Sequence, residues 1–171
     1  MHHHDPEFRF CPVCGGRLES RRLKENEPDR LVCLDCGFVF YLDPKLVACT
    51  IVEIGEGILL VKRDIQPQKG KWVIPGGYVD RGEEVHRAAI RETQEECGID
   101  ITIERLLGIY SYPGRMQVVV VYIGRPINGI PVAGEETSEV RVYSLEDIPW
   151  SQLAFQSTVD ALKDYIRSKE E

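Results

Sequence analysis

With 171 residues, of which 43% are apolar, the chain can bury one sizeable core and a small additional module, but not two full domains. Its formal charge of -7 argues against a protein that coats nucleic acid phosphates, because such binding relies on dense lysine and arginine. No apolar run approaches the roughly 20 residues that span a bilayer, and no signal-peptide pattern opens the chain, so we expect a soluble, cytoplasmic protein without membrane contact.

The first residues do not belong to the fold. Residues 1–8 contain His2, His3 and His4, a run that is typical of an expression-tag remnant. We therefore exclude 1–8 from the structural argument.

Four cysteines follow in two pairs, each with the spacing CxxC: Cys11, Cys14, Cys33 and Cys36. Two such pairs at this separation are typical of a zinc ribbon, in which four thiolates close a tetrahedral shell. Residues 9–40 hold too few apolar side chains for a core of their own, so zinc would supply the folding energy. Redox or disulfide motifs are the alternative, but no thioredoxin-like βαβ pattern surrounds either pair. We predict a structural zinc ribbon over 9–40.

From residue 41 onward, short apolar runs separated by glycine and proline predict a second domain, 41–171. The interruption Pro75-Gly76-Gly77 suits a place where the backbone closely approaches a ligand. Strands interleaved with two helices indicate an α/β layered domain with a mixed sheet. The predicted strands are 46–54, 58–62, 72–79, 101–111, 116–124 and 139–143, and the predicted helices are 83–97 and 151–167.

The first predicted helix carries acids where apolar residues are expected. At about 100° per residue, Glu92 and Glu96 fall within its apolar stripe and Glu95 at the edge of that stripe. Carboxylates clustered toward a buried side repel one another and lose hydration unless a cation lies among them. A solvated acidic face is the alternative, but it would place the acids with Arg87 and Arg91 instead. Oxygen ligands without thiolate or imidazole favour Mg²⁺ or Mn²⁺, which suits phosphoryl chemistry on an anionic substrate.

The pattern Gly77-x5-Glu83-x7-Arg91-Glu92-Thr93-Gln94-Glu95-Glu96-Cys97-Gly98-Ile99 resembles the Nudix box. Thr93 departs from it, because the family more often has an aliphatic residue there. The resemblance implies a Nudix α/β/α sandwich with a mixed sheet, preceded by the zinc ribbon. It also implies that Glu92, Glu95 and Glu96 are catalytic metal ligands, joined by the carbonyl of Gly76, and that Arg91 pairs with Glu83 to orient the helix.

The zinc ribbon resembles that of two Nudix subgroups, the NADH pyrophosphatases and the FAD or ADP-ribose diphosphatases. The segment Tyr110 to Met116 does not match the Ser-Gln-Pro-Trp-Pro-Phe-Pro-like signature of the former, so the second subgroup is favoured. This resemblance implies metal-dependent hydrolysis of the diphosphate in ADP-ribose or FAD, with release of AMP. The alternatives are an NADH-directed or house-cleaning Nudix enzyme, and a nucleotide-sensing or nucleic-acid-binding module without catalysis. Some zinc-bearing relatives are homodimers, so a homodimer is also left open.

Other candidate residues depend on single observations. Glu139 precedes a predicted strand where related enzymes often place an extra carboxylate for metal binding or base work, although a plain loop acid fits equally well. The aromatic candidates could stack on a base or a flavin, and ordinary packing is the alternative interpretation. The arginines could bind phosphate, and plain exposure to solvent is the alternative. These substrate-contact candidates are Arg63, Tyr78, Tyr112, Arg115 and Phe155.

Overall fold

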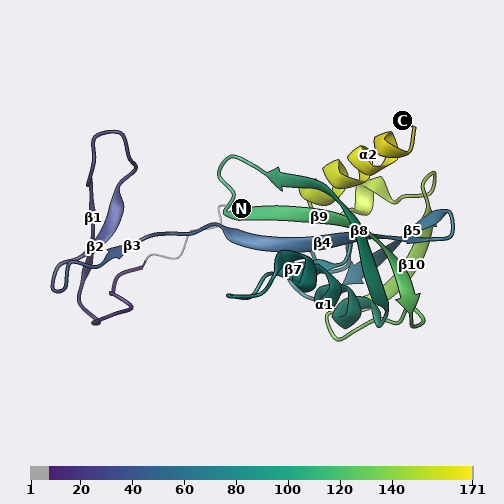
Figure 1. The fold of residues 1–171 in the computed structure, drawn as a ribbon, viewed down its shortest axis with the longest axis horizontal. Coiled ribbons are helices and arrows are strands. Elements are labelled where there is room, and N and C mark those ends of the chain that lie inside the picture. The colour runs from purple at the N-terminus through teal and green to yellow at the C-terminus, as the bar shows by residue number, and fades with distance from the viewer. Residues whose placement is uncertain (1–7, 171) are drawn as a thin grey trace. The chain divides into compact units, whose positions relative to one another are not determined.

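The computed structural model describes residues 8–170, and the chain divides into two compact units, Met1–Asp43 and Pro44–Glu171 (Figure 1). Most of the segment interpreted as a tag remnant therefore lies outside the described residues. Within residues 8–170, no helix is long and apolar enough to cross a membrane.

The first unit is a small antiparallel sheet with the order β1-β2-β3. Its strands are β1 (Leu18–Arg21), β2 (Arg30–Cys33) and β3 (Val39–Phe40). Its buried cluster consists of Cys11, Leu18 and Cys33, with Leu31 and Phe40 packed against them. So small a cluster cannot offset the entropy of ordering the segment, which agrees with a metal-stabilised module.

The second unit is built around a mixed sheet with the strand order β10-β5-β4-β9-β8. Strands β4 and β9 pair in parallel, and the other neighbouring strands of this sheet pair antiparallel. The short strands β6 and β7 pair with β5 and β4, respectively. The strands are β4 (Lys45–Ile54), β5 (Gly57–Arg63), β6 (Trp72–Val73), β7 (Gly76–Tyr78), β8 (Asp100–Ser111), β9 (Gln117–Asn128) and β10 (Thr137–Ser144).

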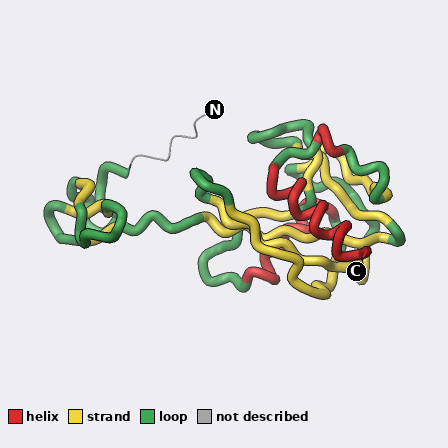
Figure 2. The backbone as a smooth tube through the Cα atoms, turned by 90° about the horizontal axis from the view of Figure 1, so that it is seen from above, coloured by secondary structure: helices red, strands yellow, loops and turns green. Residues whose placement is uncertain are grey.

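The two helices, α1 (Val85–Cys97) and α2 (Gln156–Glu170), cover opposite faces of this sheet (Figure 1). Alternate residues of the central strands point to opposite faces, so each strand contributes to two separate clusters. Ile51 and Leu60 pack with Leu162 of α2, while their neighbours Val52 and Leu59 pack with Cys97 of α1. Seen from above, α2 lies across the strands (Figure 2). The predicted α/β/α sandwich with a mixed sheet is confirmed.

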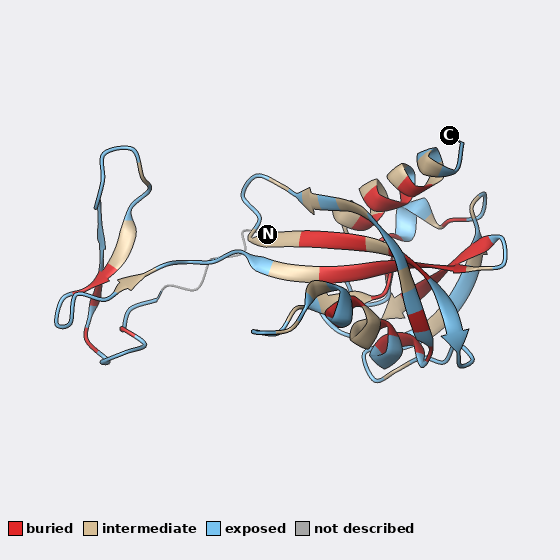
Figure 3. Cartoon of the chain, viewed as in Figure 1, coloured by how far each residue is buried: buried red, intermediate tan, exposed pale blue. Residues whose placement is uncertain are grey.

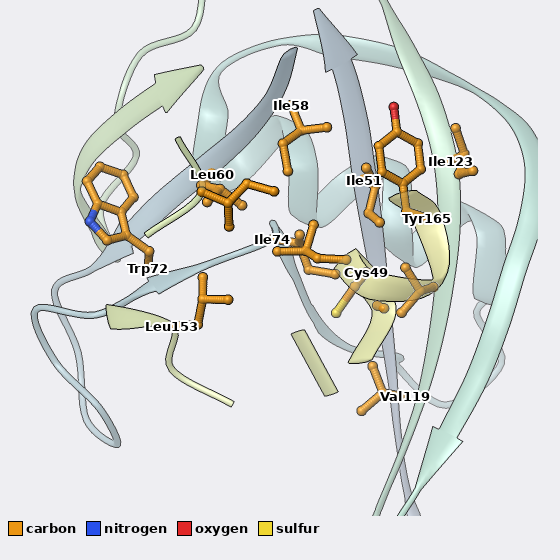
Figure 4. Packing of buried hydrophobic residues seen from close by; sticks show 14 residues of the cluster. Cys49, Ile51, Ile58, Leu60, Trp72, Ile74, Val119, Ile123, Leu153 and Tyr165 are labelled. Atoms are coloured by element: carbon orange, nitrogen blue, oxygen red, sulfur yellow. The ribbon is translucent and has the colours of Figure 1, made fainter. Parts of the chain in front are cut away.

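Burial is concentrated in the central strands β4, β5 and β9 (Figure 3). The larger cluster, on the α2 side, contains Trp72, Ile74 and Leu153 around the end of the sheet, together with Cys49 and Val119 (Figure 4). This packing fixes the short segment between β6 and β7, which leads directly into Gly76 and Gly77 of β7.

Several element boundaries differ from the prediction: the predicted strand 72–79 is the two short strands β6 and β7, β9 continues to Asn128 rather than ending at residue 124, and both helices begin later. Helix α1 begins at Val85 rather than at residue 83, because the carboxylate of Glu83 accepts hydrogen bonds from the Asp80 amide and from Arg91. The predicted helix 151–167 is a 3-10 turn η1 (Trp150–Gln152) followed by α2. Between them the chain is extended, since the Ala154 amide donates to the Trp72 carbonyl at 2.8 Å.

Candidate active site

Helix α1 lies close to the sheet because small side chains form the contact. Ala88 and Ala89 are fully buried against Ala48 of β4. The helix ends at Gly98, which adopts the left-handed conformation with φ 67° and donates its amide to the Gln94 carbonyl. The close approach brings the acidic residues of α1 next to β7.

Two glycines of β7 make room for these acids. A Cβ on Gly76 would collide with the carbonyl oxygen of Ala48 and with Cys49, and the φ of Gly76 is 153°. A Cβ on Gly77 would collide with the carboxylate of Glu92. The amide of Gly76 donates to Oε2 of Glu96 at 2.9 Å. The backbone of β7 therefore lies directly against the acids of α1.

Of the acids of α1, Glu96 is buried and Glu92 is partly buried. Glu96 is only 8% exposed, and its burial raises its pKa to about 7; the Gly76 amide and Arg63 oppose this shift, whereas Glu92 and Glu136 add to it. Burial also raises the pKa of Glu92, against the opposing effect of Arg91. Burial and mutual repulsion make it unfavourable for both carboxylates to be ionised. A cation between them would remove this penalty, so the arrangement favours cation binding.

Arg91 organises the outer side of the cluster. Its Nε and Nη2 donate to the two carboxylate oxygens of Glu83, each at 2.9 Å, and its Nη1 donates to Glu92 at 2.7 Å and to Glu95 at 3.2 Å. Nη2 also donates to the carbonyl of Tyr78 at 3.1 Å. The hydrogen bonds from Arg91 and Asp80 lower the pKa of Glu83 to about 2. Arg91 thus joins β7, the loop before α1 and the helix.

Glu95 differs from the other two acids of α1 in its exposure. Its side chain is 54% exposed, compared with 16% for that of Glu92. The structure thus brings Glu92 and Glu96 together beside Gly76 and places Glu95 at the solvent edge, where only Arg91 holds it among the described residues.

The sequence reasoning missed Glu136, in the loop before β10. Its charge raises the pKa of both Glu92 and Glu96. The loop is attached to the end of α1, because the Gly134 amide and the Thr137 hydroxyl both donate to the Glu96 carbonyl, at 3.1 and 3.0 Å. The only signal in the sequence is the acidic pair Glu135-Glu136 ahead of a predicted strand, which does not distinguish it from Glu139.

Glu139 lies elsewhere. It faces Lys62 in the register of β10 with β5 and forms ion pairs with Lys62, at 3.5 Å, and with Arg141. Lys62 and Arg141 both lie over the ring of Trp72, which belongs to the cluster on the α2 side. Glu139 is therefore on the sheet face opposite α1.

The candidate substrate contacts fall into different places. Arg63 is close enough to lower the pKa of Glu96, and its guanidinium lies over the ring of Phe155. Tyr78 is exposed beside Gly77, whereas the hydroxyl of Tyr112 donates to Asp160 of α2 at 2.6 Å. Within residues 8–170, the side chain of Arg115 makes no hydrogen bond or ion pair.

In the first unit, the four predicted cysteines form one cluster, with their Sγ atoms all within 4.8 Å of one another. Amides of the two turns donate to these sulfurs, from Val13 to Cys11 and from Gly16 to Cys14, each at 3.4 Å. The Cys36 amide lowers the pKa of Cys33 to about 7. Four thiolates at this spacing, partly satisfied by amides, suit a tetrahedral zinc ion and leave no position for a water.

Both units match known families. Residues 43–163 match the family described as NUDIX domain, and residues 9–42 match the Nudix N-terminal zinc ribbon. The protein belongs to the Nudix family and carries its N-terminal zinc ribbon. It is an enzyme of the class that hydrolyses diphosphate bonds, as the sequence predicted.

Among similar proteins, the "ADP-ribose pyrophosphatase" of Methanocaldococcus jannaschii is 38% identical over 159 residues, which cover 91% of this chain and 88% of that protein. The "NAD-capped RNA hydrolase NudC" of Vibrio atlanticus is 29% identical over 119 residues; the matched part is 68% of this chain but only 42% of that protein. A NUDIX hydrolase from Nitrosomonas europaea has a similar structure, with a TM-score of 0.90 and 32% identity, over 95% of this chain and 93% of that one.

Proposed function

We propose that the enzyme hydrolyses the diphosphate of ADP-ribose, with FAD as the next candidate, and releases AMP. The observation that carries this proposal is the position of the buried Glu96 and the partly buried Glu92 beside the glycines of β7. The 38% identical relative named ADP-ribose pyrophosphatase supports this choice of substrate, since the likeness covers both units of the chain.

The donor set fits a divalent cation with a preference for oxygen. Glu92, Glu95, Glu96 and Glu136 supply carboxylates, and we propose the Gly76 carbonyl as a further ligand, as the Nudix resemblance implies. Arg91 and Arg63 bring positive charge to these acids. When bound, Mg²⁺ or Mn²⁺ supplies neutralisation of the diphosphate charge and activation of water.

Each residue has a separate role in this proposal. Glu92, Glu95 and Glu96 would hold the cation, while Arg91 and Glu83 fix the helix that carries them. In the reaction, water adds to one phosphorus, the bond from that phosphorus to the bridging oxygen breaks, and the bridging oxygen leaves with the other phosphate. With ADP-ribose the products are AMP and ribose 5-phosphate.

We assign the additional carboxylate of the site to Glu136. Its charge reaches Glu92 and Glu96, whereas that of Glu139 is engaged by Lys62 and Arg141 on the other sheet face. Arg63 is the proposed contact to a phosphate oxygen, because its positive charge lowers the pKa of Glu96. Tyr78 is exposed next to Gly77 and is the proposed contact to a base.

A substrate panel tests this function. ADP-ribose, FAD, NADH and diadenosine compounds are incubated with the full chain and Mg²⁺ or Mn²⁺, and AMP release is measured. We expect ADP-ribose to give the highest kcat/KM and Glu96→Gln to lower it at least a hundredfold. Glu84→Gln is the matched control, because Glu84 precedes the same helix but is exposed and pairs only weakly with Arg87, at 3.8 Å.

The panel also separates the alternatives. Preference for NADH would favour an enzyme like the NudC relatives, and binding of every substrate without cleavage would favour a nucleotide sensor. We propose that the zinc ion of the ribbon is structural, because its four thiolates leave no open position. The six free cysteines suit a reducing compartment, so we propose a cytoplasmic location. A homodimer remains a proposal that molecular mass in solution would test.

A further inference from the structure

Arg63, at the end of β5, has a guanidinium that is fixed from two sides. Its Nε donates to the carbonyl of Pro67 at 2.8 Å, and its Cζ lies 5.2 Å from the ring centroid of Phe155. The backbone of Arg63 is held as well, since its amide donates to Lys71 at 3.0 Å and its carbonyl accepts from Gly70 at 2.8 Å. The side chain therefore has a defined direction before any substrate binds.

The Phe155 ring is itself well anchored. Phe155 comes directly before α2, and its carbonyl accepts from the Val159 amide at 3.2 Å. The preceding residue, Ala154, is bound to Trp72 through a backbone hydrogen bond. The ring packs against the cluster on the α1 side, which includes Val61 and Val73. Because the core and the guanidinium both cover it, this ring is poorly placed to stack on an adenine or flavin, the role that the sequence left open for it.

Arg63 lies beside the loop that is attached to the end of α1, and its terminal nitrogens are unused. Within residues 8–170, no hydrogen bond or ion pair uses Nη1 or Nη2 of Arg63. Arg63 faces Thr137 in the register of β5 with β10, and the Thr137 hydroxyl donates to the Glu96 carbonyl at 3.0 Å; the next residue, Asp64, donates its amide to the carbonyl of Glu136 at 2.8 Å. A cation bound by the acids of α1 would hold a phosphate of the substrate nearby. That phosphate could then accept hydrogen bonds from Nη1 and Nη2 of Arg63.

We infer that Phe155 is a positioning residue: it holds the Arg63 guanidinium so that both terminal nitrogens reach one phosphate of the diphosphate beside Glu96. The inference rests on the proposed function. A planar guanidinium recognises phosphate through paired donors only in a limited range of orientations, so restricting that range increases affinity without a direct contact from Phe155 to the substrate.

A double-mutant cycle in binding tests this coupling. The probe is the non-hydrolysable α,β-methylene analogue of ADP-ribose, whose Kd is measured by calorimetry in Mg²⁺ for the full chain and for Arg63→Lys, Phe155→Leu and the double variant. We expect Arg63→Lys to raise Kd about thirtyfold, and Phe155→Leu about fivefold. The double variant should match Arg63→Lys within about twofold, because Phe155 acts only through Arg63.

Two further variants separate positioning from general packing. Phe155→Tyr keeps the ring face and should restore Kd to within about twofold of the unsubstituted protein. Tyr41→Leu is the matched control, because Tyr41 also lies under an arginine, Arg30, at 5.0 Å, but belongs to the zinc ribbon unit. It should leave Kd unchanged.

Additive losses in the cycle would overturn the inference, as would a Phe155→Leu loss that disappears when the probe lacks its base, since that would indicate stacking. Turnover is a separate outcome. If the unsubstituted protein binds the analogue with the expected coupling but cleaves none of the panel substrates, the proposed function fails while the role of Phe155 stands.

Discussion

Gly77→Ala should damage activity far more than stability. The added Cβ would occupy the position of the Glu92 carboxylate, which is the far end of a flexible side chain and can move away. The move breaks the 2.7 Å hydrogen bond from Arg91 and takes one carboxylate out of the cluster around Glu96. The fold loses little, whereas the cation site loses a ligand.

The magnitudes follow from these contacts. The Arg91–Glu92 contact is partly exposed and contributes about 0.2–1 kcal/mol, so the free energy of unfolding should fall by no more than about 1 kcal/mol. Displacing a catalytic group by about 1 Å costs about a hundredfold in rate, so kcat/KM for ADP-ribose should fall by about that factor. Urea denaturation and AMP release at several Mn²⁺ concentrations measure the two effects, and high Mn²⁺ should recover part of the activity.

Two other glycines calibrate the result. Gly76→Ala meets backbone atoms of Ala48 and Cys49 and has an unfavourable φ, so it should destabilise the fold by about 3 kcal/mol. Gly108→Ala meets only the end of the Tyr110 side chain, at 3.0 Å, and is the matched control. Full turnover and unchanged Mn²⁺ dependence in Gly77→Ala would refute the reasoning, because the position of Glu92 would then not matter.

Three further predictions concern separate parts of the molecule. Glu136→Gln should weaken Mn²⁺ binding about tenfold, measured by calorimetry, and Glu139→Gln by less than about threefold, because only Glu136 acts on the acids of α1. Burial of Glu53 opposes its ionisation, but Lys169 and its other partners lower its pKa overall, so its contribution is present at pH 7 and is lost as pH falls through that lowered pKa. Glu53→Gln should therefore reduce the free energy of unfolding by about 1 kcal/mol at pH 7 and by less at pH 3, by urea denaturation; equal losses at both pH values would contradict this. A strong chelator should remove one zinc ion per chain and speed hydrogen exchange in the ribbon, and intact protection without zinc would show that the ribbon folds by itself.

The sequence was sufficient for the features that depend on local spacing. The periodicity of α1 placed Glu92 and Glu96 on its buried side, and the CxxC pairs identified the cysteine cluster. The pairing of Arg91 with Glu83 came from the family resemblance and is present in the structure.

Features that depend on contacts between distant segments were not predictable in this way. Glu136 acts on α1 because its loop is bound to the carbonyls at the helix end, and no local pattern records those hydrogen bonds. Tyr112 looked available for a ligand, but its hydroxyl is committed to Asp160, on a helix much later in the chain. The contact between Arg63 and Phe155 likewise joins β5 to the residue before α2.

The attachment of the loop before β10 to the end of α1 has a consequence for protein engineering. The amides of Val132 and Gly134 donate to the carbonyls of Cys97 and Glu96, and a side chain at position 134 would strike the Glu95 carbonyl. If this loop were replaced by that of a relative while the end of α1 was left unchanged, these hydrogen bonds would be lost and the acids of α1 would be displaced. Chimeras intended to change substrate preference should exchange both pieces as one cassette.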